Sequence, residues 1–178
     1  MNKNTHTPLD LFFDQLRDLY SLEVQLRDSM SHLTTLCTDD ALLDLILTHA
    51  QETEIQIEEL TMIFDRHGES PGGDHCKAMA GLIRGGTAHL EGVKSTATRD
   101  LMMIAHCLRI EYYALSAYEF TTTLSGRLGL WRERKILNQA LSQEMGMAAA
   151  LMALEPGIFE MANASYASTT VRLSPARA

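Results

Sequence analysis

The stretch LRDLYSLEVQLRDSM, residues 16–30, combines the period of an α-helix with a charged residue on the apolar side. Apolar residues recur at intervals of three and four, which predicts that one side of the helix packs in a core. Glu23 interrupts this series, and leucines stand one turn away on either side of it. Burying an unpaired carboxylate costs several kcal/mol, so the position of Glu23 needs a chemical explanation. The series runs Leu16, Leu19, Glu23, Leu26, Met30.

Three more long helices are predicted from the same period. Thr7 before Pro8 suits the cap and first turn of the first helix, and Asp39 with Asp40 suits the cap of the second. Gly68 is placed to end the second helix, because glycine readily adopts a left-handed conformation. We expect the four long helices over about residues 8–37, 41–67, 97–125 and 130–154.

A weak helical segment separates the second long helix from the third. It covers about residues 76–93, and its glycines lower the helix propensity, so we interpret it as a crossover connection. Pro156 and Gly157 are expected to close the fourth helix. The predicted fold is therefore all-α, a ferritin-like four-helix bundle with a short helix in the crossover between helices 2 and 3. We expect a disordered N-terminus at 1–7, the bundle at 8–155 and a mobile tail at 156–178.

The composition favours a single folded domain in a reducing compartment. Of 178 residues, 46% are hydrophobic, and the formal net charge of -8 argues against a nucleic-acid partner. Cys37, Cys76 and Cys107 are few and widely spaced, which favours buried thiols over a disulfide framework. Neither a signal peptide nor a run of about 18 apolar residues is visible, so we expect a cytoplasmic protein with no membrane segment.

Each long helix places one glutamate where a core residue belongs. All four lie about 13 to 15 residues into their helices, so at a rise of 1.5 Å per residue their levels differ by only a few ångströms. Mid-helix positions of a bundle meet in one layer, and the sequence therefore predicts four converging carboxylates. They are Glu23, Glu52, Glu111 and Glu144.

Four buried carboxylates require protonation, a basic partner or bound cations. Arg109 is expected to point away from the Glu111 face, whereas Arg27 lies one turn from Glu23 and reaches partway toward it. Two divalent cations would balance four carboxylates, and oxygen ligands suit iron(II), manganese or magnesium. The ordinary alternative to burial is that the helix phase is misjudged, or that the glutamate lies at the edge of the core and extends its carboxylate into water.

Several stretches resemble the YciE/YciF family of stress-associated ferritin-like proteins. The resemblance covers about residues 9–154, and CKAM at 76–79 is its most specific part. It implies a fold related to rubrerythrin, homodimers, a di-metal site at the four glutamates and the ferroxidase activity commonly proposed for the family. The matching residues are LRDLYSLEVQL at 16–26, HAQETEIQIEEL at 49–60, CKAMAGLI at 76–83, Glu111, Tyr113, Ala117, Tyr118 and Glu144.

The chain departs from this family at several ligand positions. The third helix of the family continues Glu-His-Tyr-Glu, whereas here Ala114 stands in place of the second carboxylate. Gln143 and Ala148 likewise replace acidic residues of the fourth helix. The general di-iron pattern, a glutamate followed three residues later by histidine, is also missing. The resemblance thus implies a minimal four-carboxylate site that binds iron less tightly, prefers another hard metal or stays empty.

Five more residues are candidates for supporting roles. His49 and Gln56 lie one turn either side of Glu52, and His49 is either a ligand, a hydrogen-bonding neighbour of a glutamate or a satisfied core histidine. The tyrosines either orient carboxylates, serve redox chemistry or simply pack in the core. These tyrosines are Tyr20, Tyr113 and Tyr118.

Three functional hypotheses follow. The first is a ferroxidase or peroxide-consuming stress protein with two ions of iron, manganese or another hard divalent metal, bridged, by the resemblance, by Glu52 and Glu144. The second is a non-catalytic dimeric bundle with a degenerate or empty site, and the third is metal storage without turnover. For a homodimer, the outer faces of the first two helices are the expected surface, with Phe13, Leu22, Ile57 and Phe64.

Overall fold

The computed structural model describes residues 6–73 and 75–173, and within them every regular element is an α-helix. The predicted all-α fold, with a short helix in the connection between the second and third long helices, is confirmed. Most of the N-terminal segment expected to be disordered, 1–7, lies outside the described residues. The helices are α1 (Pro8–Leu36), α2 (Asp40–His67), α3 (Lys77–Gly92), α4 (Thr96–Arg127) and α5 (Trp131–Leu173).

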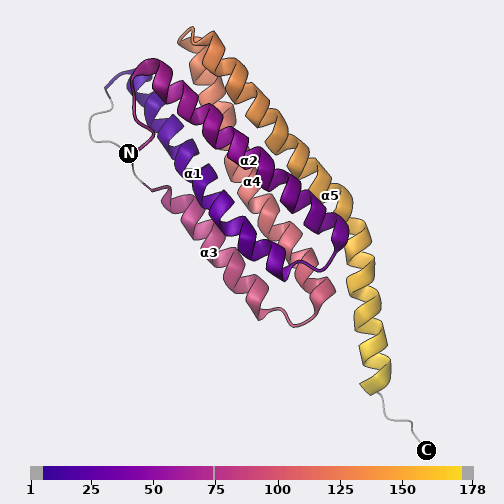
Figure 1. Cartoon of the computed structure of the whole chain (residues 1–178). Coiled ribbons are helices and arrows are strands. Elements are labelled where there is room, and N and C mark those ends of the chain that lie inside the picture. The colour runs from indigo at the N-terminus through magenta and orange to yellow at the C-terminus, as the bar shows by residue number, and fades with distance from the viewer. Residues whose placement is uncertain (1–5, 74, 174–178) are drawn as a thin grey trace, which may run out of the picture.

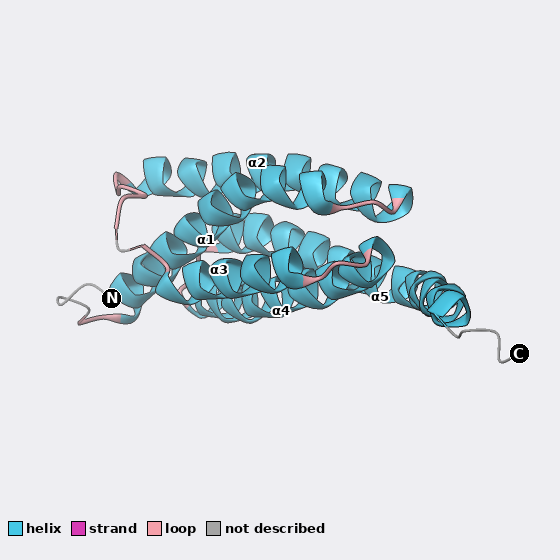
Figure 2. Ribbon diagram, turned by 90° about the horizontal axis from the view of Figure 1, so that it is seen from below, coloured by secondary structure: helices cyan, strands magenta, loops and turns pink. Residues whose placement is uncertain are grey.

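The helices α1, α2, α4 and α5 form a bundle, and α3 lies on the outside of it (Figure 1). α1 packs against α2 and α4, and α5 packs against the same two helices, so α1 and α5 are diagonal partners. α3 lies alongside α1 and α4 and brings the chain back along the bundle before α4 begins (Figures 1 and 2). This long crossover allows α2 and α4 to run in the same direction, as in ferritin-like bundles.

The helix ends follow local signals in the sequence. Thr7 and Asp10 form a capping box at the start of α1, with Asp10 N donating to Thr7 Oγ1 at 3.1 Å and Thr7 N donating to Asp10 Oδ2 at 2.9 Å. Asp39 Oδ1 accepts from Leu42 N at 2.9 Å and caps α2. Gly68, with φ of 64°, ends α2 as predicted.

Two apolar clusters fill the bundle on either side of a central polar layer. One surrounds Phe12, Leu16 and Phe64, and the other surrounds Leu42 and Leu151. Each cluster draws side chains from at least four helices, so the clusters fix the helices in register above and below the middle of the bundle. This register determines which side chains face one another in the polar layer.

The expected dimer surface on α1 and α2 is wrong. Phe13, Leu22, Ile57 and Phe64 are all buried within the single chain, with at most 7% of their surface exposed. The reason is that α1 packs against three helices, α2, α3 and α4. Its apolar band is consequently wider than the single stripe that faces a four-helix core.

α5 does not end before Pro156, but continues through it to Leu173. Proline costs about 3 kcal/mol inside a helix because it removes one backbone hydrogen bond. The apolar spacing continues beyond it, and Ile158 and Ala162 are 2% and 8% exposed. Ile158 joins the cluster around Leu42 and Leu151, and this burial opposes the break that a proline and a glycine would otherwise cause.

We also expected no apolar segment long enough to cross a membrane, and α5 differs from this expectation. Within the described residues, Trp131–Ala167 is long and apolar enough to cross a membrane by length and composition, with a mean hydropathy of 1.2 in its best window. Core helices of bundles pass the same test, and 28% of this window is buried in the protein. The remainder leaves an apolar face of α5 exposed.

We predict opposite effects for alanine at two adjacent glycines of α3. A Cβ at Gly86 would overlap the buried imidazole of His106 on α4, so Gly86→Ala is expected to destabilise the fold by roughly 1–3 kcal/mol. A Cβ at Gly85 meets nothing within 4 Å, and Gly85→Ala is expected to gain up to about 1 kcal/mol. Urea unfolding measures both, and His106→Ala added to Gly86→Ala should recover part of the loss. Equal effects at the two glycines would contradict this packing of α3 on α4.

Candidate metal centre

Five polar side chains meet in the middle of the bundle, between the two apolar clusters. α1 contributes Glu23, α2 contributes His49 and Gln56, α4 contributes Glu111 and α5 contributes Glu144. None of them exposes more than 2% of its surface. Glu23, Glu111 and Glu144 are three of the four glutamates expected at this depth, and they lie close enough to influence one another's pKa values.

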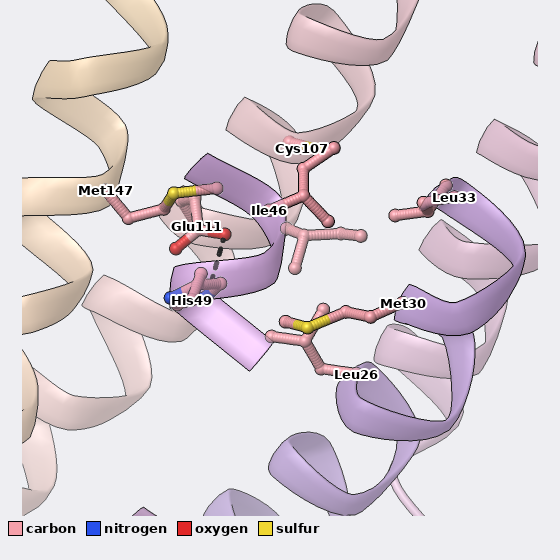
Figure 3. Close-up of a pocket in the computed structure, with 9 residues that line it drawn as sticks. Leu26, Met30, Leu33, Ile46, His49, Cys107, Glu111 and Met147 are labelled. Carbon is pink, nitrogen blue, oxygen red and sulfur yellow. Dashed lines mark ion pairs between the residues drawn. The ribbon is translucent and has the colours of Figure 1, made fainter. Parts of the chain in front are cut away.

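His49 is the hub of this group. Its Nε2 lies 3.4 Å from Glu111 Oε1 and 3.9 Å from Glu144 Oε2. Figure 3 shows the imidazole and the Glu111 carboxylate facing one another, with the side chain of Met147 beside them. Gln56 Nε2 donates to Glu144 Oε1 at 2.7 Å and so fixes one oxygen of that carboxylate. Ligand atoms of His49, Glu111 and Glu144 lie within 4.8 Å of one another, close enough to share an ion.

Glu52 does not join the buried group, and its predicted inward position is wrong. Its side chain is 34% exposed, and its Oε2 lies 3.5 Å from His49 Nδ1 on the outer side of the imidazole. The inward positions of α2 follow the intervals three and four through His49, Thr53 and Gln56, so Glu52 is one residue out of phase. This phase makes His49 the central member from α2.

The three tyrosines considered for supporting roles have different surroundings. Tyr118 is fully buried, and its hydroxyl lies close enough to Glu23 to lower the pKa of that carboxyl. Tyr113 is directed elsewhere, with its hydroxyl 3.3 Å from both Cys76 Sγ and Asp18 Oδ2. Tyr20 packs edge-on against the ring of Phe64. Of the tyrosines, only Tyr118 belongs to the centre.

Many polar atoms in this layer have no hydrogen-bond partner among the described residues. Buried polar groups are normally paired, and each unpaired group costs about 1–3 kcal/mol. The orphaned atoms include both carboxylate oxygens of Glu23, Oε2 of Glu111, Oε2 of Glu144 and both ring nitrogens of His49. Carboxylate oxygens and imidazole nitrogens that lack partners can be satisfied by protons or by a bound cation, so this layer is a candidate cation-binding site.

Basic side chains do not supply the missing positive charge. Arg27, the nearest candidate from the sequence, instead pairs with Asp28 Oδ1 at 2.7 Å and lies 3.8 Å from Glu54. Among the described residues, no arginine or lysine forms an ion pair with the three buried carboxylates. The imidazole of His49 is therefore the only protein cation available to them within that part of the chain.

Burial and mutual repulsion change the protonation of the group. Burial raises the pKa of Glu23 to about 7, although Tyr118 and His49 oppose this shift. The pKa of Glu144 rises well above its usual value through burial and through the charges of Glu23 and Glu111. Burial opposes protonation of His49, but the negative charges of Glu111 and Glu23 near the ring outweigh it and raise the pKa. All three shifts favour a protonated, less negative centre when no cation is bound.

An apolar cavity adjoins the polar group. Its volume of about 10 Å³ is room for about one water molecule. His49 and Glu111 form its polar end, and the rest of its wall is hydrophobic (Figure 3). The hydrophobic lining is Leu26, Met30, Leu33, Ile46, Cys107, Ile110 and Met147.

The chemistry of the donors favours a first-row transition metal. Carboxylates alone suit magnesium or calcium, whereas an imidazole among them favours ions such as iron(II), manganese(II) or zinc(II). A carboxylate on the outer ring nitrogen, as Glu52 provides, is the usual support of a metal-binding histidine. The group of His49, Glu111 and Glu144 can therefore hold a metal ion.

Comparisons with known proteins agree with this fold. The profile of the family described as Domain of unknown function (DUF892) matches residues 7–164. Protein YciF of Escherichia coli strain K12 is 29% identical over 142 residues, which are 79% of this chain and 86% of that protein.

Solved structures of similar proteins have the same helical fold. The crystal structure of the E. coli stress protein YciF superposes with a TM-score of 0.84 and 27% identity, over 88% of this chain and 99% of that one. YcfI of Rhodopseudomonas palustris, described as a proposed structural protein, gives a TM-score of 0.81 and 25% identity, over 85% of this chain and 96% of that one.

We predict that the metal-free protein loses stability as the pH rises from about 5 to 8. Glu23 has a folded pKa of about 7 against an ordinary value of 4.5, so in this window the folded state retains a proton that the unfolded state has released. The raised pKa values of Glu144 and His49 act in the same direction. Thermal unfolding of chelator-treated protein at several pH values measures the slope.

The matched variants for this test are Glu23→Gln and Glu58→Gln. Glu23→Gln removes one of the coupled protons and is expected to flatten the slope. Glu58 is exposed on α2, and Glu58→Gln should leave the slope as it is. Stability that stays level or rises between about pH 5 and 8 would show that the buried carboxylates are not held protonated.

Proposed function

The chain belongs to the family described as Domain of unknown function (DUF892), and from that premise we propose that its bundle binds redox-active divalent metal ions and oxidises them as part of a stress response. The observation that carries this proposal is the group of orphaned carboxylate and imidazole atoms in the core. The E. coli relative is named a stress protein, which supports the physiological setting.

The protein's own residues define how an ion would be held. His49 Nε2, Glu111 and Glu144 would bind the first ion, and Gln56 would hold the second oxygen of Glu144 in place. Glu52 would orient His49 from outside the core rather than bridge two ions. Glu23, which lies outside the group of three, would serve a second ion.

Iron(II) is the proposed metal, with manganese(II) as its closest substitute. Two divalent ions would more than neutralise three carboxylates, and bound iron(II) would supply electrons to dioxygen or peroxide. The apolar clusters above and below the centre exclude water from it. Tyr118 would keep the carboxylate of Glu23 oriented through its hydroxyl.

A non-catalytic bundle is the second candidate. Ala114 and Ala148, where the resembled family has acidic residues, are 0% and 5% exposed, so no other polar group fills those places in the core. The R. palustris relative is described as a proposed structural protein. Under this alternative the centre holds metal for stability or storage and does not turn over.

We also propose a reducing, cytoplasmic location. All three cysteines are free thiols, and Cys76 and Cys107 are buried. Burial raises the pKa values of the Cys37, Cys76 and Cys107 thiols, which keeps them protonated and unreactive.

The proposal predicts that iron(II) or manganese(II) stabilises the purified protein. Binding to the folded state adds about 2.7 kcal/mol at a free metal concentration of 100 times the dissociation constant, so the melting temperature must rise by several degrees. Glu111→Gln should abolish most of this rise, because it removes a carboxylate that faces His49 at 3.4 Å. Glu119→Gln, two turns further along α4 and exposed, is the matched control and should keep it.

Anaerobic loading followed by exposure to air separates the two candidates. Oxidation of bound iron(II) by the wild type, lost in Glu111→Gln and kept in Glu119→Gln, supports the ferroxidase. Metal binding without faster oxidation than in buffer supports storage or a structural role. If neither metal changes the melting temperature of the wild type, the metal-binding proposal itself is wrong.

A further inference from the structure

The cavity beside the candidate metal centre is enclosed by the core of the bundle. Its wall contains side chains from α1, α2, α4 and α5, and none of the lining residues exposes more than 5% of its surface. It lies where the two apolar clusters meet, since Leu26 and Ile110 belong to one cluster and Ile46 and Met147 to the other. The occupant of this space is therefore decided by an almost entirely apolar wall (Figure 3).

Water is a poor occupant of this cavity. A buried water molecule normally makes two to four hydrogen bonds. His49 and Glu111 carry the only strong hydrogen-bonding groups among the lining side chains, and they face one another, with His49 Nε2 and Glu111 Oε1 3.4 Å apart. Both residues are also candidate ligands of the first ion, so a bound ion would occupy the atoms on which a water molecule depends.

Hydrogen peroxide meets the same obstacle. Each of its two hydroxyl groups needs hydrogen-bond partners, and a buried polar group left without one lowers occupancy by about tenfold or more. Dioxygen has no hydrogen to donate and needs no partner, so an apolar space favours it over water. It is only slightly larger than the single water molecule that the volume of about 10 Å³ admits. The flexible thioether chains of Met30 and Met147 in the wall can yield the difference.

We propose that this cavity binds dioxygen, and that dioxygen rather than peroxide is the oxidant of the centre. The inference rests on the proposed function for its chemistry, although entry of the gas into the cavity requires no bound metal. In the reaction, dioxygen accepts one electron from each of two iron(II) ions and two protons from water, and it leaves as hydrogen peroxide. The apolar wall favours the departure of this more polar product.

The position of the cavity keeps the oxidant apart from the remaining polar atoms of the centre. His49 and Glu111 belong both to the cavity and to the group that can hold the first ion. Glu23, Gln56 and Glu144 do not line the cavity. Dioxygen would thus reach the first ion past His49 and Glu111, and the carboxylate of Glu23 would stay available to the second ion.

Dioxygen itself is the probe that tests the site in the metal-free protein. It is paramagnetic, so methyl groups beside a bound molecule relax faster in NMR spectra recorded under oxygen pressure. In the full chain, the methyl groups of Ile46, Ile110 and Met147 are expected to show several times the enhancement of the methyl groups of Ile63. Ile63 is equally buried but lies in the cluster around Phe12, Leu16 and Phe64. Equal enhancement at Ile63 and at the lining residues would overturn the proposal.

Exchanges at two cysteines test the role of the cavity in oxidation. Cys107→Leu fills the cavity from α4, so it should remove most of the selective enhancement. It should also raise the KM for dioxygen in iron(II) oxidation by about fivefold or more, and slow oxidation by added peroxide less. Cys37→Leu is the matched control, because Cys37 is a half-buried thiol that does not line the cavity. If Cys107→Leu does not fold, Cys107→Ala enlarges the cavity instead and should increase the enhancement.

The results distinguish a failure of this inference from a failure of the proposed function. A wild type that oxidises bound iron(II) without selective enhancement overturns the dioxygen site and leaves the ferroxidase standing. A folded Cys107→Leu with the dioxygen KM of the wild type overturns the role of the cavity in the same way. Selective enhancement in a protein that neither iron(II) nor manganese(II) stabilises supports the gas site and overturns its role in metal oxidation.

Discussion

The structure depends on an unbalanced group of charges held at the centre of the bundle. Three carboxylates and one imidazole, each from a different helix, converge where apolar side chains would otherwise pack. They have no arginine or lysine partner among the described residues, and several of their atoms are orphaned. Such a layer persists only if protons or cations satisfy it, so the apolar clusters on either side must provide the stability that this layer lacks.

The rotation of α2 about its axis decides which donor atoms face the centre. His49 rather than Glu52 enters the core, which gives the centre one nitrogen among oxygens and leaves a carboxylate outside to support the ring. The donor set therefore differs from an all-carboxylate site in the metals that it favours. The buried alanines at 114 and 148 keep the rest of that layer apolar, so few side chains decide what the centre can bind.

α5 has one side buried in the bundle and one side with exposed apolar residues. Glu144 is buried in the core, while the next residue, Met145, is 58% exposed. One helix thus carries a residue of the candidate metal centre on one side and exposed apolar side chains on the other. The helix continues through Pro156, because Ile158 and Ala162 after it are still buried. Figure 1 shows α5 extending past the ends of the other helices.

The sequence alone determined the positions of the helices except the end of α5, and the inward glutamates of α1, α4 and α5, because hydrogen bonding within a helix and its 3.6-residue period are local properties. It did not determine whether Glu52 or His49 enters the core, since the two residues are three positions apart and differ by a rotation of only about 60° around the helix. It also misplaced Phe13 and Leu22, which are buried because α1 packs against α3 as well as α2 and α4. The number of neighbours around a helix, and the rotation that best buries its apolar side among them, exist only once the chain has folded.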